Sequence, residues 1–218
     1  FGYLEPAAVD SSVQAIHPES GAARVLFSSE EVERGAFVAV TLLPAGEDQV
    51  AVAVATDAGE DRLLLIPAAG GPAREVLTHR SPDLPALAWS EELERLLVAW
   101  GDEVLQITSE GEVELRYPER GLPGVSPEGD FLAFTSFREA TDSTAPGLRL
   151  YRPNGSLVQV LTDLPMTSLL WQPQGRYVFF VTGEQLLASR IPTGEAWLVQ
   201  ENMPEFDFLH SMTWVGVQ

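Results

Sequence analysis

The sequence of 218 residues contains no cysteine and no lysine. The absence of cysteine excludes disulfides, thiolate metal sites and a cysteine nucleophile. It has 13 basic residues, all arginine, and 32 acidic ones, so the formal charge is −19. Because binding to nucleic acid or an anionic membrane requires a basic surface, we expect neither. The acidic excess is compatible with association with cations or a basic partner, although a solvated acidic surface is the simpler interpretation.

Long apolar runs are absent as well. No stretch of about 18 apolar residues occurs, so no membrane insertion is expected for this segment. The chain begins at Phe1 without a methionine or a charged-then-apolar leader, which indicates a mature form or a domain cut from a longer protein. A hydrophobic content of 45% is sufficient for the core of one domain.

What the chain does contain is a repeat, clearest between Ser168 and Val199. Proline and glycine in the turn Gln172–Gly175 and in Pro192–Gly194 separate short apolar or β-branched runs, which favour strands over helices. We label the four predicted strands a, b, c and d; they cover Ser168–Trp171, Tyr177–Thr182, Gln185–Ile191 and Ala196–Val199. Four antiparallel strands with turn residues at fixed offsets are typical of a propeller blade.

The same unit recurs along the chain. Its c–d turn occurs five times, ending at Gly21, Gly70, Gly111, Gly155 and Gly194. Strand a of one unit is missing at the N-terminus, whereas an unaccompanied strand a, Ser211–Val217, lies at the C-terminus. We therefore predict that Ser211–Val217 pairs with Phe1–Glu5 and closes the ring, because closure removes exposed sheet edges. A segment of a larger propeller is the less favoured alternative, since it would leave two blade faces bare.

The predicted fold is thus all-β: a five-bladed β-propeller of four-stranded antiparallel blades, closed by a split blade. A helix over Glu91–Trp100 fits the periodicity but not the alignment with strands a and b of the other units. We expect Trp89, Trp171 and Trp214 to pack between blades. The blades cover residues 211–218 with 1–29, then 35–79, 86–117, 121–162 and 168–200.

One turn carries a family resemblance. The run Val125–Phe134 (VSPEGDFLAF) resembles the WSPDG-x-x-(I/L)-A-F signature of TolB-like, WD-related β-propeller repeats, with Glu128 in place of the signature's aspartate. Leu148–Tyr151 and Val160–Thr162 are similar to other strands of that family. The resemblance implies a propeller, often extracytoplasmic in bacteria and often a binding platform. It implies no catalytic residue.

Candidate ligand-binding residues lie on the b–c and d–a loops, which share one face of a propeller. The loop 79–83 combines a histidine, a cation and a carboxylate, and is either a ligand contact or a solvated turn. The loop 202–210 carries acids, aromatics and a histidine, which could bind Ca²⁺ with neighbouring acids, form a protein-binding patch, or pack over the seam between blades. The candidates are His79, Arg80, Asp83, Arg120, Arg138, Asp163, Glu205, Phe206, Asp207, Phe208 and His210.

The leading functional prediction is a non-enzymatic binding or scaffold module for a protein or small-molecule partner. We expect it to be extracytoplasmic, monomeric alone, and without a cofactor or metal. One alternative is a carbohydrate-binding or glycoside-processing propeller, although the predicted strands a contain no carboxylate. The other alternative is a structural subunit of an envelope assembly. No GxSxG motif of a serine hydrolase is present.

Overall fold

The structure is a computed structural model of the chain. It describes residues 12–16, 19–28, 36–43, 49–56, 60–80, 85–136, 147–164, 166 and 168–202. Their secondary structure consists of strands and turns. By compactness the chain divides into two units: residues 1–89, 94–101 and 105–114 form the first, and residues 90–93, 102–104 and 115–218 the second.

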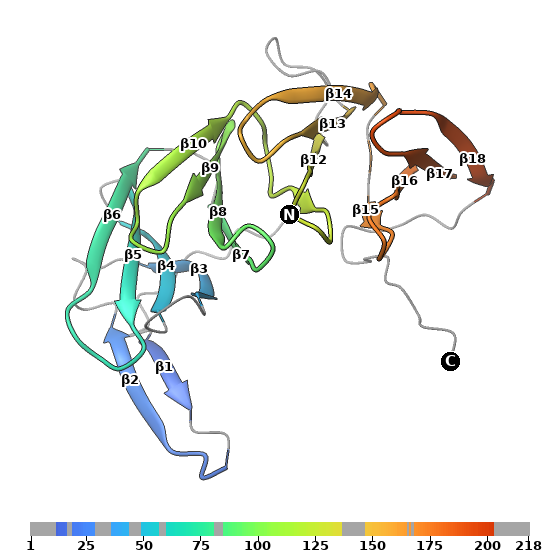
Figure 1. Ribbon diagram of the computed structural model, residues 1–218. Coiled ribbons are helices and arrows are strands. Elements are labelled where there is room, and N and C mark those ends of the chain that lie inside the picture. Colours follow the sequence, from blue (N-terminus) through green and yellow to red (C-terminus); the bar gives the residue numbers. More distant parts are fainter. Residues whose placement is uncertain are drawn as a thin grey trace. The chain divides into compact units, whose positions relative to one another are not determined.

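Four of the sheets are four-stranded antiparallel meanders (Figure 1). The first contains β3 (Ala36–Leu43), β4 (Gln49–Ala55), β5 (Asp61–Pro67) and β6 (Arg74–His79). The second contains β7 (Ala86–Ser90), β8 (Arg95–Trp100), β9 (Glu103–Ile107) and β10 (Val113–Tyr117). The third contains β11 (Gly124–Val125), β12 (Leu132–Ser136), β13 (Gly147–Tyr151) and β14 (Leu157–Thr162). The fourth contains β15 (Ser168–Trp171), β16 (Tyr177–Thr182), β17 (Gln185–Arg190) and β18 (Ala196–Gln200).

A fifth, two-stranded sheet precedes them. Strands β1 (Ser12–Ile16) and β2 (Ala23–Ser28) form an antiparallel hairpin. Phe27 of this hairpin belongs to a buried cluster with Val52, Val54 and Ile66 of the next sheet. The hairpin therefore packs on that sheet through apolar side chains.

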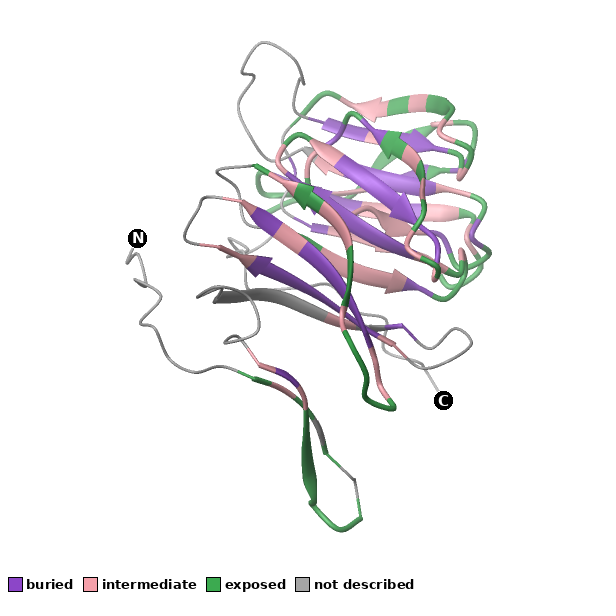
Figure 2. Ribbon diagram, turned by 90° about the vertical axis from the view of Figure 1, so that its left-hand side faces the viewer, coloured by how far each residue is buried: buried purple, intermediate pink, exposed green. Residues whose placement is uncertain are grey.

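Burial follows the order of the strands within each sheet (Figure 2). The inner strands β4, β5, β8 and β9 are almost continuously buried, whereas every residue of the outer strand β18 is exposed. Continuous apolar runs are what a strand covered on both faces requires. The first unit has a second core around Leu63, Leu96 and Trp100, and the second unit has a core around Leu150, Trp171 and Phe180.

The turn glycines confirm the predicted repeat. All five c–d turn glycines have a positive φ, between 67° and 92°. Four of these turns are closed by a bond in which the glycine N–H donates to a carbonyl three or four residues earlier. The a–b turns at Gly129 and Gly175 repeat one another, with N–H donation to Ser126 and Gln172 respectively. Local turn chemistry therefore sets the meander.

The sequence predictions agree with this architecture in most places. Residues 91–94 form a turn and β8 a strand, so the rejection of a helix there is confirmed. Strand β11 is shorter than the predicted 122–125, because Pro123 has no N–H for the ladder. The strands predicted over Phe1–Glu5 and Ser211–Val217 lie outside the described residues, so blade count and closure stay predictions.

Two of the three tryptophans predicted to be in the core are described, and both predictions are confirmed. Trp171 is 7% exposed, and its indole N–H donates to the carbonyl of Gly124 on the neighbouring sheet at 3.0 Å. A Cβ at Gly124 would lie 2.5 Å from Leu169 Cδ2, so a larger residue there would require the Leu169 side chain to move. Trp89 packs, partly buried, on the core of the first unit. Trp214 lies outside the described residues.

Candidate functional site

The b–c loop and the residues after strand d meet at one end of a sheet. In the first four-stranded sheet, Asp61 at the start of β5 pairs in register with His79 at the end of β6. In the third sheet, a Cβ on Gly147 would overlap the carbonyl oxygen of Thr162 and lie 3.2 Å from Asp163 Cα. We call this the b–c/d–a end of a sheet, and it is where the sequence places a ligand.

The first polar cluster at such an end is the Asp61 cluster, which consists of Glu60, Asp61, His79, Arg80 and Trp100. The Trp100 indole Nε1–H donates to Asp61 Oδ2 at 3.1 Å. The ring of His79 stacks on that of Trp100, with centroids 5.0 Å apart and planes at 28°. Trp100 is fully buried and Asp61 is 7% exposed. The indole therefore satisfies a carboxylate oxygen that burial would otherwise leave without a donor.

The predicted candidates His79 and Arg80 differ in their surroundings. Strand β6 runs one residue further than predicted, so His79 belongs to the strand rather than to the loop. Arg80 has a side-chain exposure of 75%, and its Nε donates to Glu60 Oε1 at 3.0 Å. Thr56 Oγ1 donates in turn to the Glu60 carbonyl at 2.6 Å, which closes the b–c loop. Arg80 is thus a solvent-facing cation paired with Glu60, and these two residues adjoin His79 and Asp61 in the chain.

The second polar cluster lies in the second unit and was not predicted. We call it the Glu119 cluster; it consists of Tyr117, Glu119, Phe134, Arg149 and Tyr151. Arg149 Nη1 donates to Glu119 Oε2 at 3.0 Å, and the Tyr151 hydroxyl donates to Oε1 at 2.7 Å. The side chains of Glu119 and Arg149 are 2% and 13% exposed. Both carboxylate oxygens are therefore engaged in a nearly dry environment.

Tyr151, which contacts this ion pair, packs with two further aromatic rings. Tyr117, Phe134 and Tyr151 lie with centroids between 5.1 and 5.6 Å apart, and the two contacts of Tyr151 are edge-on. Burial raises the pKa of Tyr117 to about 12. Burial, followed by the hydrogen bond to Glu119, raises the pKa of Tyr151 as well. The tyrosines are therefore held protonated, as donors rather than as bases.

The remaining candidates are less connected. Arg120 is half-buried, and its Nε has no hydrogen-bond partner among the described residues. Asp163 is exposed beside β14. Seven candidates lie outside the described residues: Asp83, Arg138, Glu205, Phe206, Asp207, Phe208 and His210.

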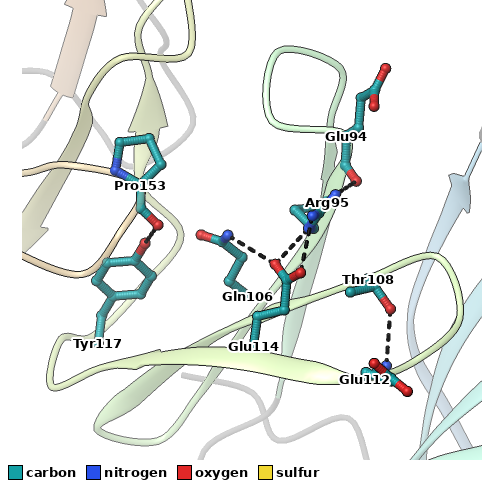
Figure 3. A network of polar contacts seen from close by, with 8 residues as sticks. All are labelled: Glu94, Arg95, Gln106, Thr108, Glu112, Glu114, Tyr117 and Pro153. Carbon is teal, nitrogen blue, oxygen red and sulfur yellow. Dashed lines mark hydrogen bonds and ion pairs between the residues drawn. The ribbon is translucent and has the colours of Figure 1, made fainter.

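The opposite end of the second sheet carries a charge network that satisfies itself. Figure 3 shows Arg95 and Gln106 directed at the carboxylate of Glu114, with Arg95 Nε at 2.6 Å and Gln106 Nε2 at 3.4 Å. The bond from Arg95 lowers the pKa of Glu114, and the same bond raises the pKa of Arg95. Glu103 at the start of β9 and Arg116 near the end of β10 form a further pair at 2.8 Å, but this pair lies at the b–c/d–a end of the same sheet. These charges are partly exposed, and each is paired with a charge of the opposite sign.

Neither a metal site nor a membrane span emerges from the part of the chain that the structure covers. Within that part, no group of three or more histidine, cysteine, aspartate or glutamate residues could hold a metal ion. No helix in the same ranges is long and apolar enough to cross a bilayer. The residues proposed for Ca²⁺ are, apart from Asp163, outside it.

The sequence carries one signal for the Glu119 cluster, an arginine within an apolar inner strand. Arg149 stands between Leu148 and Leu150 in an inner strand, where an arginine needs an acidic partner. The partner itself is 30 residues away, and no local pattern identifies it. The same holds for Asp61 and Trp100, which are 39 residues apart.

No protein-family model matches this chain, and no curated protein matches it. Solved structures do. The chain is similar to TolB from Acinetobacter baumannii at a TM-score of 0.51 and 17% identity, over 87% of this chain and 49% of that one. It is similar to a chain of the Mitotic Checkpoint Complex at a TM-score of 0.57 and 12% identity, over 86% of this chain and 57% of that one. It is similar to the Neurospora crassa Pan2 WD40 domain at a TM-score of 0.57 and 13% identity, over 89% of this chain and 60% of that one.

These similarities show the fold. The chain has the β-propeller repeat fold of TolB-like and WD40 domains, and the resemblance predicted from its turns is confirmed at that level. The chain spans about half the length of the TolB chain and less than two thirds of the other two.

Proposed function

We propose that the chain is a non-enzymatic binding or scaffold module that presents the b–c/d–a ends of its sheets to a protein or small-molecule partner. The observation that carries this proposal is the Asp61 cluster. Arg80 is displayed to solvent in an ion pair with Glu60, and the residues next to this pair in the chain, Asp61 and His79, contact the buried Trp100. Rigid support beneath an exposed cation lowers the entropy lost when a partner binds.

The opposite end of the sheets offers less to a partner. It consists of glycine turns closed by their own backbone bonds, and in the second sheet Arg95 is paired there with Glu114. A partner there would have to break existing pairs before forming new ones. The b–c/d–a end likewise holds ion pairs, Arg80 with Glu60 and Arg116 with Glu103, and what distinguishes Arg80 is its side-chain exposure of 75%.

The buried acids support binding rather than catalysis. Glycoside hydrolysis needs two carboxyl groups facing one substrate. Within the described residues, Glu119 faces Arg149 and Tyr151 instead, and both its oxygens are taken. The proposal requires no cofactor, and it places the protein outside the cytoplasm as a monomer.

Closure of the ring is part of the proposal. Ser211–Val217 supplies the strand a that the N-terminal blade lacks, so five blades result. Deletion of residues 211–218 is expected to lower the midpoint and the cooperativity of urea unfolding and to promote self-association. A truncated protein as stable and monomeric as the parent would contradict closure and favour a segment of a larger propeller.

Binding is tested with a matched pair of charge reversals in the second unit. Asp163→Arg changes the b–c/d–a end, and Glu128→Arg makes the same change on an exposed a–b turn at the other end. Affinity capture from host extract is expected to lose its specific partner with Asp163→Arg, and with Arg80→Glu in the first unit, but not with Glu128→Arg. Equal capture by all three variants would overturn the proposal.

A glycan array and a panel of hydrolase assays distinguish the proposed binding module from the main alternative, a carbohydrate-binding or glycoside-processing propeller. The proposal expects no signal from either. A clear signal that disappears with Asp163→Ala would instead establish a carbohydrate-active propeller. A protein that captures nothing by its b–c/d–a end, yet copurifies in an assembly through other surfaces, would be a structural subunit.

A further inference from the structure

The outer strands of the four-stranded sheets are of two kinds. Strands β6 and β10 carry charged residues, some of which pair with charges on the neighbouring inner strand: Glu75 with Arg62, and Arg116 with Glu103. Strands β14 and β18 contain no charged residue. Charges on an edge strand oppose the addition of a strand from another chain, so β14 and β18 lack this protection.

Strand β18 is the more exposed of the two uncharged strands. All five of its residues are exposed, and three consecutive ones are large and apolar: Trp197 at 42%, Leu198 at 43% and Val199 at 47%. In its sheet β18 is the edge strand and has a single neighbour, β17 (Figure 1). A strand with one neighbour turns the N–H and C=O groups of its other side away from the sheet, where they can pair with an added strand.

The rest of the sheet holds this edge in place. The inner strands are anchored in the core of the second unit by Val178 and Phe180, which are at most 1% exposed. The Trp197 ring meets the ring of Tyr177 edge-on, with centroids 5.5 Å apart. An edge that is already ordered loses little conformational entropy when another strand binds to it.

Acidic residues stand at both ends of β18. Glu195 precedes the strand and Glu201 follows it, and both are exposed. The β17–β18 hairpin with its flanking residues, 183–202, holds one further acid, Glu184, and a single cation, Arg190. The chain as a whole has a formal charge of −19, which opposes a second copy of itself at this edge. The complementary occupant is a strand with basic residues at its ends.

We propose that the free edge of β18 is a docking site for an extended segment of a partner protein, apolar or β-branched in the middle and basic at both ends. The segment adds one strand to the sheet. Its main chain bonds to the free edge, its middle residues contact Trp197 on one face and Leu198 on the other, and its basic ends lie against Glu195 and Glu201. This surface goes beyond the binding proposed for the b–c/d–a ends.

A synthetic peptide tests the docking site on the full chain. The probe is labelled Arg-Val-Thr-Val-Thr-Val-Arg, and fluorescence anisotropy measures its binding. It is expected to bind and to slow hydrogen exchange at the amides of residues 196–200. The same peptide with glutamate at both ends is expected to bind at least about tenfold more weakly. Absence of binding, equal binding of the two peptides, or protection elsewhere than in β18 would each overturn the proposal.

Two matched lysine substitutions localise the binding. Val199 and Val158 both stand at a shift of register between an inner and an outer strand, so neither has a register partner. Val199→Lys puts a cation on the β18 edge and is expected to weaken binding of the arginine peptide about tenfold. Val158→Lys makes the same change on β14 and is expected to bind like the parent. Equal affinities of the two variants would contradict docking on β18.

A charge exchange gives a readout that loss of folding cannot imitate. In the double variant Glu195→Lys with Glu201→Lys, the preference between the two peptides is expected to reverse. An unchanged preference would show that these acids do not select the occupant. Urea midpoints of all variants establish that they are folded.

The experiment also identifies other occupants. A dimer in sedimentation that Val199→Lys abolishes would overturn the proposal and assign the edge to a second copy. Peptide binding that appears only after deletion of residues 203–218 would assign it to the chain's own C-terminal residues. Capture of a partner through the b–c/d–a end is expected to persist in Val199→Lys, so failure of this docking site is distinguishable from failure of the proposed function.

Discussion

Among the described residues two carboxylates are buried, and the structure stabilises them differently. Asp61 accepts a bond from a neutral indole, and its cluster continues to solvent through Glu60 and Arg80. Glu119 accepts bonds from a guanidinium and from the phenol of Tyr151, whose ring packs edge-on against Tyr117 and Phe134. The comparison shows how depth determines the partner that a carboxylate needs.

The physical reason is the cost of desolvation. A carboxylate at the rim of a sheet keeps part of its interaction with water, so one neutral donor can suffice. A carboxylate that is 2% exposed has lost nearly all of it and requires a cation together with further donors. The Asp61 cluster is therefore suited to presenting a surface, and the Glu119 cluster to fixing β10 and the residues after it on the next sheet.

The largest expected effect breaks the Glu119 cluster. Arg149→Met removes the cation and leaves the Glu119 carboxylate buried without it, which is expected to cost about 3–5 kcal/mol of unfolding free energy at neutral pH. Urea denaturation measures the change. The double variant Arg149→Met with Glu119→Leu is expected to recover much of the loss, because it removes the unpaired charge. A single variant within about 1 kcal/mol of the parent would show that Glu119 needs no cation.

A smaller effect is expected in the Asp61 cluster. Trp100→Phe removes the indole N–H from a buried acceptor and is expected to cost about 1–3 kcal/mol, measured in the same way. Asp61→Asn keeps an oxygen acceptor for the indole and is the milder control. If the asparagine variant lost as much stability as Trp100→Phe, the charge rather than the acceptor would be what the cluster requires.

The smallest effect at neutral pH concerns Tyr117, whose hydroxyl donates to the Pro153 carbonyl at 3.1 Å. Tyr117→Phe is expected to cost about 1 kcal/mol at pH 8. The pKa of Tyr117 rises from 10.0 to about 12 in the folded chain, so the unfolded chain loses this proton first. The stabilisation is complete below pH 10 and is lost as the pH rises towards 12.

The variant should therefore lose stability less steeply than the parent between pH 10 and 12, as followed by unfolding at fixed pH. Some slope is expected to remain in Tyr117→Phe, because the pKa of Tyr151 is raised in the same direction. Parallel declines in the two proteins would indicate that Tyr117 ionises as readily in the folded chain as in the unfolded one.

Much of the fold could be predicted because its signals are local. Glycines at fixed offsets closed the turns as expected, and the strand at Arg95–Trp100 was recognised by its alignment with other units. The boundary at His79 was missed by one residue, since a strand continues as far as its partner does, here Asp61.

The candidate site was predicted less well. The selection of polar loop residues identified His79 and Arg80 of the Asp61 cluster but not Glu60, Asp61 or Trp100. Asp61 and Trp100 lie in strands whose other residues are mostly apolar and buried. The sequence therefore marks these positions as core rather than as part of a site. Glu119 follows an aromatic strand end and reads like any other loop acid.

The sequence by itself determined the strands, the turns and the class of fold, because each depends on residues a few positions apart. The tertiary structure decided which buried charges meet, which side chain bonds to which glycine of a neighbouring sheet, and which cation is displayed to solvent. These depend on residues 20 to 47 positions apart, and only packing of one sheet element against another brings them together.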